Sequence, residues 1–171
     1  LYFEDTGYTL ETMPQIQLMF NTSEAHAQIA QMVQQMWAET LGIQVQVSNQ
    51  EWQTYLNTLD EDAPNVFRYG WCADYPDPHN FLSDVYYSTS GNNDTNWAND
   101  EYDSILDEAK LLTDNEVRKE MYARAEHILT WEDAAIAPVY FYTKISMIGT
   151  HLDASPSIIG IERYDKWDIL S

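Results

Sequence analysis

The sequence predicts an α/β fold, because strand-like and helix-like apolar patterns alternate along it. Residues 15–20 and 43–47 alternate apolar and polar side chains, which is typical of strands with one buried face. Between them, residues 25–40 space apolar side chains as an amphipathic helix does. A strand, a helix and a strand over residues 15–48 predict a βαβ unit with parallel strands and a right-handed crossover.

The helix predicted over residues 25–40 is bounded by residues that favour helix ends. Residues 21–23 carry side chains that can cap its start, and Glu24 is favourable in a first turn. Gly42 suits the left-handed conformation in which many helices end. The face predicted to be buried consists of Ile29, Met32, Val33, Met36 and Trp37.

The rest of the chain is predicted to continue as a mixture of helices and strands. A helix over 51–59 is expected to bury Trp52, Tyr55, Leu56 and Leu59. A helix over 100–112 and a second one capped by Asp114 form a predicted helical pair within 100–130. The buried faces of this pair are predicted to contain Tyr102, Ile105, Leu106, Ala109, Val117, Met121, Ala125, Ile128 and Leu129. Further strands are predicted at 66–67, 139–142, 145–148 and 166–170.

A Pro-rich stretch, residues 68–82, is predicted to be an irregular ligand loop at the end of a strand. Gly70 allows a close approach of the backbone, and Pro76 and Pro78 are expected to exclude a helix. The loop displays Trp71, Asp74, Tyr75 and Asp77. Aromatic planes beside a carboxylate suit a cationic or peptide-like ligand, and the alternative is a surface loop with solvated aspartates.

The charge balance argues against nucleic acid as a partner. Lys and Arg together number 8 and Asp and Glu number 28, which gives a formal net charge of −20. Such a chain repels phosphate backbones and anionic membrane surfaces and attracts cationic ligands, although a solvated acidic shell is the alternative for most of these charges. No apolar run reaches the roughly 18 residues that predict a membrane-spanning helix.

The segment Gly70-Trp71-Cys72-Ala73-Asp74-Tyr75, followed by Pro78 and Phe81-Leu82, resembles a motif of bacterial oligopeptide-binding proteins, which are extracellular solute-binding proteins of family 5. The resemblance extends, in order, to residues 21–23, 41–43, 49–52, 118–129 and 136–140. It implies one lobe of a bilobal, periplasmic-binding-protein-like (class II) fold, with a mixed sheet flanked by helices. Residues 1–171 would then form a single partial, peptide-binding lobe from the C-terminal part of a longer protein.

The same resemblance implies extracytoplasmic binding of oligopeptides for delivery to an ABC importer, without catalysis and without a cofactor. The implied partners are a peptide, the ABC permease subunits and the missing lobe of the same protein. The implied location is the periplasm or the outer face of the cytoplasmic membrane, reached with a signal peptide and, in a lipoprotein, held by a lipid anchor. Binding of a dipeptide, a nickel chelate or a sugar remains open, as does a sensor or adhesion role on the same fold.

Residues that would bind the two ends of a peptide follow from the resemblance. Asp74 would bind the N-terminal ammonium, and the alternative is a capping or turn-stabilising aspartate. Arg68 and His26 would meet the C-terminal carboxylate, and the alternative for His26 is a solvated residue in the first turn of its helix. A further family position for such a cation falls on Leu59, which is apolar, and this leaves ligand length open.

Other residues are expected to line the pocket. These are Trp52, Trp71, Tyr140 and Asn21. Each of the three aromatic residues has an ordinary role in a hydrophobic core as its alternative.

Chemistry beyond binding has little support in the sequence. Cys72 is the only cysteine, and because the motif cysteine is disulfide-bonded in some family members, a partner would lie outside these residues. Asp74, Asp77 and His79 offer acid–base groups, and a hydrolase that uses them, or the Cys72 thiol, is the least favoured alternative. The sequence contains no nucleophile elbow, zinc-protease motif or phosphate-binding loop, so the prediction is a protein that is not an enzyme and holds no metal.

Overall fold

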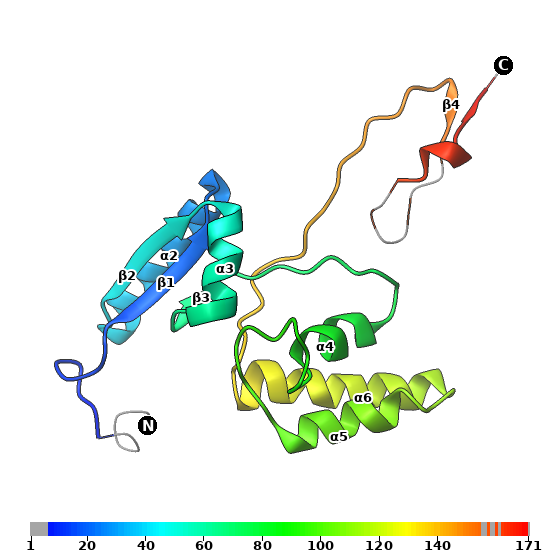
Figure 1. Cartoon of the computed structure of the whole chain (residues 1–171). Helices are drawn as coiled ribbons and strands as arrows, with labels where there is room; N and C mark the ends of the chain where they lie inside the picture. Colours follow the sequence, from blue (N-terminus) through cyan, green and yellow to red (C-terminus); the bar gives the residue numbers. More distant parts are fainter. Residues whose placement is uncertain (1–6, 155–156, 158–159, 161, 171) are drawn as a thin grey trace. The chain divides into compact units, whose positions relative to one another are not determined.

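The computed structural model describes residues 7–154, 157, 160 and 162–170. The chain divides into two compact units, Leu1–Gly70 and Trp71–Ser171, and each is described by itself (Figure 1). The first unit is a parallel sheet with helices, and the longer regular elements of the second unit are all helices. The predicted α/β class is therefore confirmed.

The first unit is built on a three-stranded sheet in the order β2-β1-β3. Strand β1 (Ile16–Asn21) pairs in parallel with β2 (Val45–Gln50) on one side and with β3 (Val66–Phe67) on the other. The register aligns Ile16 with Val45 and Asn21 with Gln50. Strand β1, helix α2 and strand β2 thus make a parallel βαβ unit.

Helix α2 (Glu24–Leu41) covers one face of this sheet. Ala30 packs against Leu18, Phe20 and Val45 in a buried cluster. The helix ends at Gly42, whose φ of 71° is left-handed, as predicted. Ser23 stands at the N-cap position but forms no side-chain cap hydrogen bond.

The buried face of α2 differs from the predicted one at two positions. Met32 is 61% exposed and Met36 is 50% exposed, whereas Ala27 and Ala30 face the sheet together with Val33 and Trp37. The face of α2 that contains the two alanines packs on the sheet, and the two methionines lie outside this face.

Helix α3 (Trp52–Asp62) packs on the opposite face, where Met19 contacts Tyr55 and Leu59. Because successive side chains of a strand point to opposite faces, Leu18 and Phe20 face α2 while Met19 faces α3. Figure 1 shows the strands with α2 and α3 on their two sides. Of the residues predicted to be buried on α3, Tyr55 and Leu59 are buried and Trp52 is half exposed.

The second unit has a core of three helices, α4 (Pro78–Tyr86), α5 (Asp100–Ala109) and α6 (Asn115–His127), and α6 continues as the π-helical turn η1 (Ile128–Glu132). The buried residues of this core are Leu82, Tyr102, Leu106, Ala109, Tyr122, Ala125, Ile128 and Leu129. Tyr102 donates a hydrogen bond of 2.8 Å to the carbonyl of Leu82 and so ties α5 to α4. Asp114 caps α6 as predicted, but Val117 is exposed.

The prediction that Pro76 and Pro78 exclude a helix was wrong for Pro78. Pro78 is the first residue of α4, and the Asp77 side chain caps that helix. A proline is favoured at this position because its missing N–H would have no partner inside the helix and its fixed φ is already helical.

The strands predicted at 139–142 and 145–148 are also wrong. These residues pair with no strand among the described residues, and their side chains are exposed, with Phe141 at 93% and Met147 at 99%. β-branched and aromatic residues favour strands, but a strand is stable only where a neighbouring strand takes up its backbone hydrogen bonds. Further along, β4 (Leu152–Asp153) pairs antiparallel with β5 (Asp168–Ile169), which lies within the predicted terminal strand, and the short helix η2 (Tyr164–Lys166) precedes β5. None of the described helices is both long and apolar enough to cross a membrane.

Candidate functional site

Three of the predicted site residues lie together in the first unit. Asn21 is the last residue of β1 and Arg68 follows β3, so both lie at the carboxyl edge of the parallel sheet, where α/β folds commonly bind ligands. The Nη1 atom of Arg68 donates a hydrogen bond of 3.3 Å to Oδ1 of Asn21. Nδ1 of His26, in the first turn of α2, lies 3.1 Å from the carbonyl oxygen of Asn21. Asn21 thus contacts both residues that were expected to meet a peptide carboxylate.

The backbone of Arg68 is held firmly by the sheet and by α3. Its N–H donates to the carbonyl of Met19 at 2.8 Å, which continues the pairing of β3 with β1 beyond the strand itself. The buried hydroxyl of Tyr55 donates to the Arg68 carbonyl. The guanidinium folds over Gly70, where a Cβ atom would lie only 2.6 Å from Nη2 of Arg68. A glycine at position 70 therefore makes room for this arginine.

One further candidate of the first unit, Trp52, lies on α3, as does Leu59, the apolar residue at a family position for a cation. Trp52 stacks on Tyr55 with ring centroids 6.3 Å apart and remains half exposed, so its indole is available as a surface. Leu59 is buried against Met19 and Tyr55. In this chain the position is part of the core and carries no cation.

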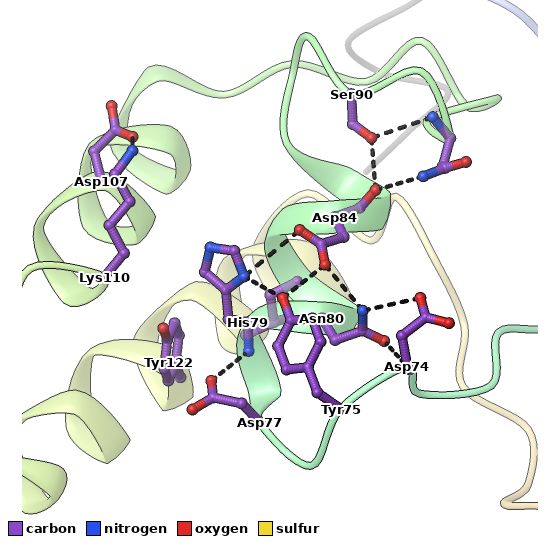
Figure 2. A network of polar contacts seen from close by, with 12 residues as sticks. Asp74, Tyr75, Asp77, His79, Asn80, Asp84, Ser90, Asp107, Lys110 and Tyr122 are labelled. Carbon is purple, nitrogen blue, oxygen red and sulfur yellow. Dashed lines mark hydrogen bonds and ion pairs between the residues drawn. The ribbon is translucent and has the colours of Figure 1, made fainter. Parts of the chain in front are cut away.

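In the second unit, Asn80 organises the loop that leads into α4. The Oδ1 atom of Asn80 accepts hydrogen bonds from Nε1 of Trp71 at 2.9 Å and from the backbone N–H of Asp74 at 3.0 Å. Its Nδ2 atom donates to Asp84 at 2.9 Å and to Oδ2 of Asp74 at 3.4 Å. Figure 2 shows Asn80 between the carboxylates of Asp74 and Asp84. Asp74 itself is exposed, and Asn80 binds both its backbone N–H and its carboxylate.

Tyr75 and His79 extend this network. The Tyr75 hydroxyl donates to Oδ2 of Asp84 at 2.7 Å and lies 2.7 Å from Nδ1 of His79 (Figure 2). Burial, together with the hydrogen bond to Asp84, raises the pKa of Tyr75 to about 12. Tyr75 therefore stays protonated and serves as a hydrogen-bond donor at neutral pH.

Asp77 binds other partners within the same unit. Its Oδ1 atom accepts the backbone N–H of His79 at 2.9 Å and its Oδ2 atom pairs with Arg118 at 2.8 Å. Asp77 and Asp74 are thus neighbours in sequence with different surroundings, because one is tied into the helices and the other faces an open pocket.

The pocket beside Asp74 has a volume of about 690 Å³ and is lined by residues of the second unit only. Trp71 and Asp74 contribute to its wall, as do Asp84 and the pair formed by Asp107 and Lys110, whose charged atoms are 2.6 Å apart. Three carboxylates against one ammonium make the lining acidic, which favours a ligand group with positive charge.

The remaining candidates lie outside these two groups. Tyr140 is half exposed and packs edge to face on Tyr142, with ring centroids 4.9 Å apart. Cys72 is an exposed free thiol. Within the described residues no group of three or more His, Cys, Asp or Glu side chains could hold a metal ion.

Three residues of this site were missed by the sequence analysis: Asn80, Asp84 and Arg118. The adjacent pair Asp77 and Pro78 is a signal that could have revealed α4, because an aspartate followed by a proline is typical of a helix start. With the helix in place, Asn80 falls in its first turn, beside the loop.

The family of the chain is decided by residues 2–93. They match the model of the bacterial extracellular solute-binding proteins, family 5 Middle, and the match covers more than half of the 171 residues. The chain belongs to this family. The resemblance expected from residues 70–82 is therefore confirmed.

Relatives of this family 5 chain are peptide-binding proteins. It is 41% identical to the oligopeptide-binding protein OppA of Bacillus subtilis over 131 residues, which make up 77% of this chain and 24% of that protein. The structure of the Escherichia coli murein tripeptide binding protein MppA matches with a TM-score of 0.84 and 33% identity, over 99% of this chain and 33% of that one. Haemophilus influenzae OppA in complex with RPPGFSPFR matches with a TM-score of 0.76 and 34% identity, over 88% of this chain and 29% of that one. The family 5 chain thus spans between 24% and 33% of the length of these relatives.

Proposed function

We propose that this chain is part of an extracytoplasmic protein that binds oligopeptides and delivers them to an ABC importer, without catalysing a reaction. The observation that carries the proposal is the placement of Asp74, whose exposed carboxylate lines an acidic pocket next to Trp71. A carboxylate beside an indole suits an ammonium group, because ionic attraction and cation–π attraction then act on the same charge.

A peptide presents such an ammonium at its N-terminus. Asp74 is the proposed partner of that group, and Trp71 is proposed as a wall against which the first residue of the peptide packs. Because the Asp74 carboxylate is exposed in this structure, a ligand ammonium can reach it without breaking the core.

The cluster of Asn21, His26 and Arg68 supports recognition of a carboxylate by the first unit. A guanidinium binds a carboxylate through two parallel hydrogen bonds, and the sheet and Tyr55 fix the Arg68 backbone from which that guanidinium extends. Trp52 of the first unit and Tyr140 of the second unit are each proposed as an aromatic surface for the peptide, because about half of each residue is exposed.

The proposed cellular setting follows from the family. We place the protein in the periplasm or at the outer face of the cytoplasmic membrane, and the name of E. coli OppA, which is 36% identical over 144 residues, describes that relative as periplasmic. The proposed partners are the ABC permease subunits and a second lobe that closes with this one over the peptide, as two-lobed binding proteins do about a hinge.

The test of this proposal is the identity of the native ligand. The intact protein would be purified without denaturant, unfolded in acid and urea, and the released small molecules analysed by mass spectrometry. Short peptides are expected, and they should be missing from a control sample that was unfolded and refolded before the analysis. Recovery of a sugar or a metal chelate in place of peptides would contradict the proposal.

A further inference from the structure

Asn80 is the one buried polar residue among the described residues, since every other buried residue is hydrophobic. Its exposed fraction is 0%. A buried amide costs stability unless its donors and acceptors find partners, so its position calls for an explanation beyond packing.

Both ends of the Asn80 amide are fully used. The oxygen accepts two hydrogen bonds, from the Trp71 indole and from the Asp74 backbone, and the nitrogen donates two, to Asp84 and to the Asp74 carboxylate. An amide group offers two N–H donors and two acceptor lone pairs on its oxygen, so all four hydrogen-bonding positions of Asn80 are occupied. An amide matches these partners, because its oxygen accepts hydrogen bonds from the two N–H groups and its nitrogen donates hydrogen bonds to the two carboxylates.

These hydrogen bonds fix the positions of two residues that line the pocket. Trp71 and Asp74 both line the pocket, and a single side chain behind them sets the edge of the indole and the direction of the carboxylate. Asp84, which Tyr75 also binds, anchors the amide from the other side (Figure 2).

We infer that Asn80 is a positioning residue, which holds Trp71 and Asp74 in the arrangement that receives a ligand ammonium. Asn80 does not touch the ligand in this scheme and acts through the two residues that do. The inference rests on the proposed function, in which Asp74 binds the N-terminus of a peptide. It adds a specificity role to a residue that lies in the core.

The test compares binding of trialanine and N-acetyl-trialanine by the intact protein, using calorimetry. Asn80→Leu keeps the size of the side chain and removes all four hydrogen bonds. We expect it to weaken binding of the free-amine peptide by roughly tenfold and binding of the acetylated peptide by clearly less, because only the free amine loses the contact with Asp74, so the preference for the free amine falls. Asn115→Leu, at the exposed start of α6, is the matched control and should preserve the preference.

A second readout follows the Trp71 indole itself. In protein labelled with ¹⁵N-tryptophan, the signal of this indole is identified by its loss in Trp71→Phe. Its hydrogen exchange should be faster in Asn80→Leu than in the wild-type protein, because its acceptor is gone. Asn80→Ala, which leaves room for water, replaces the leucine variant in both measurements if that one does not fold.

The outcomes separate this inference from the proposed function. A merely structural role predicts lower stability in thermal unfolding with an unchanged preference for the free amine, and that result overturns the inference. If Asp74→Asn in the same assay leaves the preference intact, the proposed role of Asp74 fails, whatever Asn80 does. If Asp74→Asn abolishes the preference and Asn80→Leu retains it, only the positioning role of Asn80 is wrong. If the wild-type protein binds neither peptide, that result contradicts both the proposed function and the inference about Asn80.

Discussion

The Oδ2 atom of Asp77 lies 2.8 Å from Nη2 of Arg118, so the residue that caps the start of α4 is bound directly to α6. The other oxygen of the same carboxylate caps α4 through the N–H of His79. Arg118 also donates to the hydroxyl of Tyr122, within its own helix, at 3.2 Å. Asp77 therefore stabilises the scaffold on which the neighbouring Asp74 is presented.

Two substitutions of Asp77 should separate its role as a helix cap from its ion pair with Arg118. Asp77→Asn retains an oxygen that caps the helix but loses the charge that pairs with Arg118, whereas Asp77→Ala loses both. We expect the alanine variant to be less stable than the asparagine variant by about 1 kcal/mol, which is the usual value of a helix cap. Urea unfolding of the intact protein measures the difference, and two variants of equal stability would contradict the capping role.

The same carboxylate should make stability depend on pH at the acidic end. Burial raises the pKa of Asp77, but the backbone N–H of His79 and the Arg118 guanidinium more than offset it and hold the pKa below its ordinary value of 3.8. Because the folded pKa is the lower one, this contribution is complete above the unfolded pKa and is lost as the pH falls through the folded pKa. Between about pH 5 and pH 3, Asp77→Asn should therefore lose less free energy of unfolding than the wild-type protein. Identical losses in urea titrations at the two pH values would count against the assignment.

Arg68 should distinguish peptides by their C-terminus. In the intact protein, Arg68→Met keeps most of the length of the side chain and removes the guanidinium, so binding of a peptide with a free carboxylate should weaken by roughly tenfold or more. A C-terminally amidated peptide should lose much less. Arg163→Met removes an exposed arginine that pairs with Asp165 and is the control for net charge. Equal losses for both peptides in calorimetry would exclude the proposed contact with the carboxylate.

The 171 residues alone should bind peptides weakly or not at all. In the proposed mechanism a second lobe covers the ligand, and without it the ligand keeps much of its exposed surface and the contacts to that lobe are missing. Calorimetry of the isolated chain and of the intact protein with one peptide makes the comparison. Nanomolar affinity of the isolated chain would show that no second lobe is needed.

Regular elements could be predicted where one periodicity dominates. The βαβ strands and α5 have clean apolar patterns, and the cap of α6 at Asp114 follows from a single residue type. The orientation of α2 could not be predicted, because its buried face is marked by Ala27 and Ala30, which carry almost no hydrophobic signal, while the larger Met32 and Met36 face solvent.

The candidate site was predictable in part. The residue types in the motif pointed to Trp71 and Asp74, which the structure places on one pocket wall. The family resemblance pointed to Arg68 and His26, which the structure groups with Asn21 at the sheet edge. Long-range partners could not be foreseen. The bond between Asp77 and Arg118 joins residues that are 41 positions apart, and no local pattern specifies it.

The central claim is that Asp74 receives the positive end of a peptide, and the most direct test is calorimetry of the intact protein with trialanine and N-acetyl-trialanine. Asp74→Asn should weaken binding of the free-amine peptide by about 2–5 kcal/mol, because the proposed second lobe would cover the charge pair and this is the usual range when one partner of a buried pair is removed. Binding of the acetylated peptide should change little, and Asp60→Asn, which removes an exposed carboxylate from α3, should affect neither. An equal loss for the two peptides in Asp74→Asn, or no loss for either, would contradict the assignment of this carboxylate to the ligand ammonium.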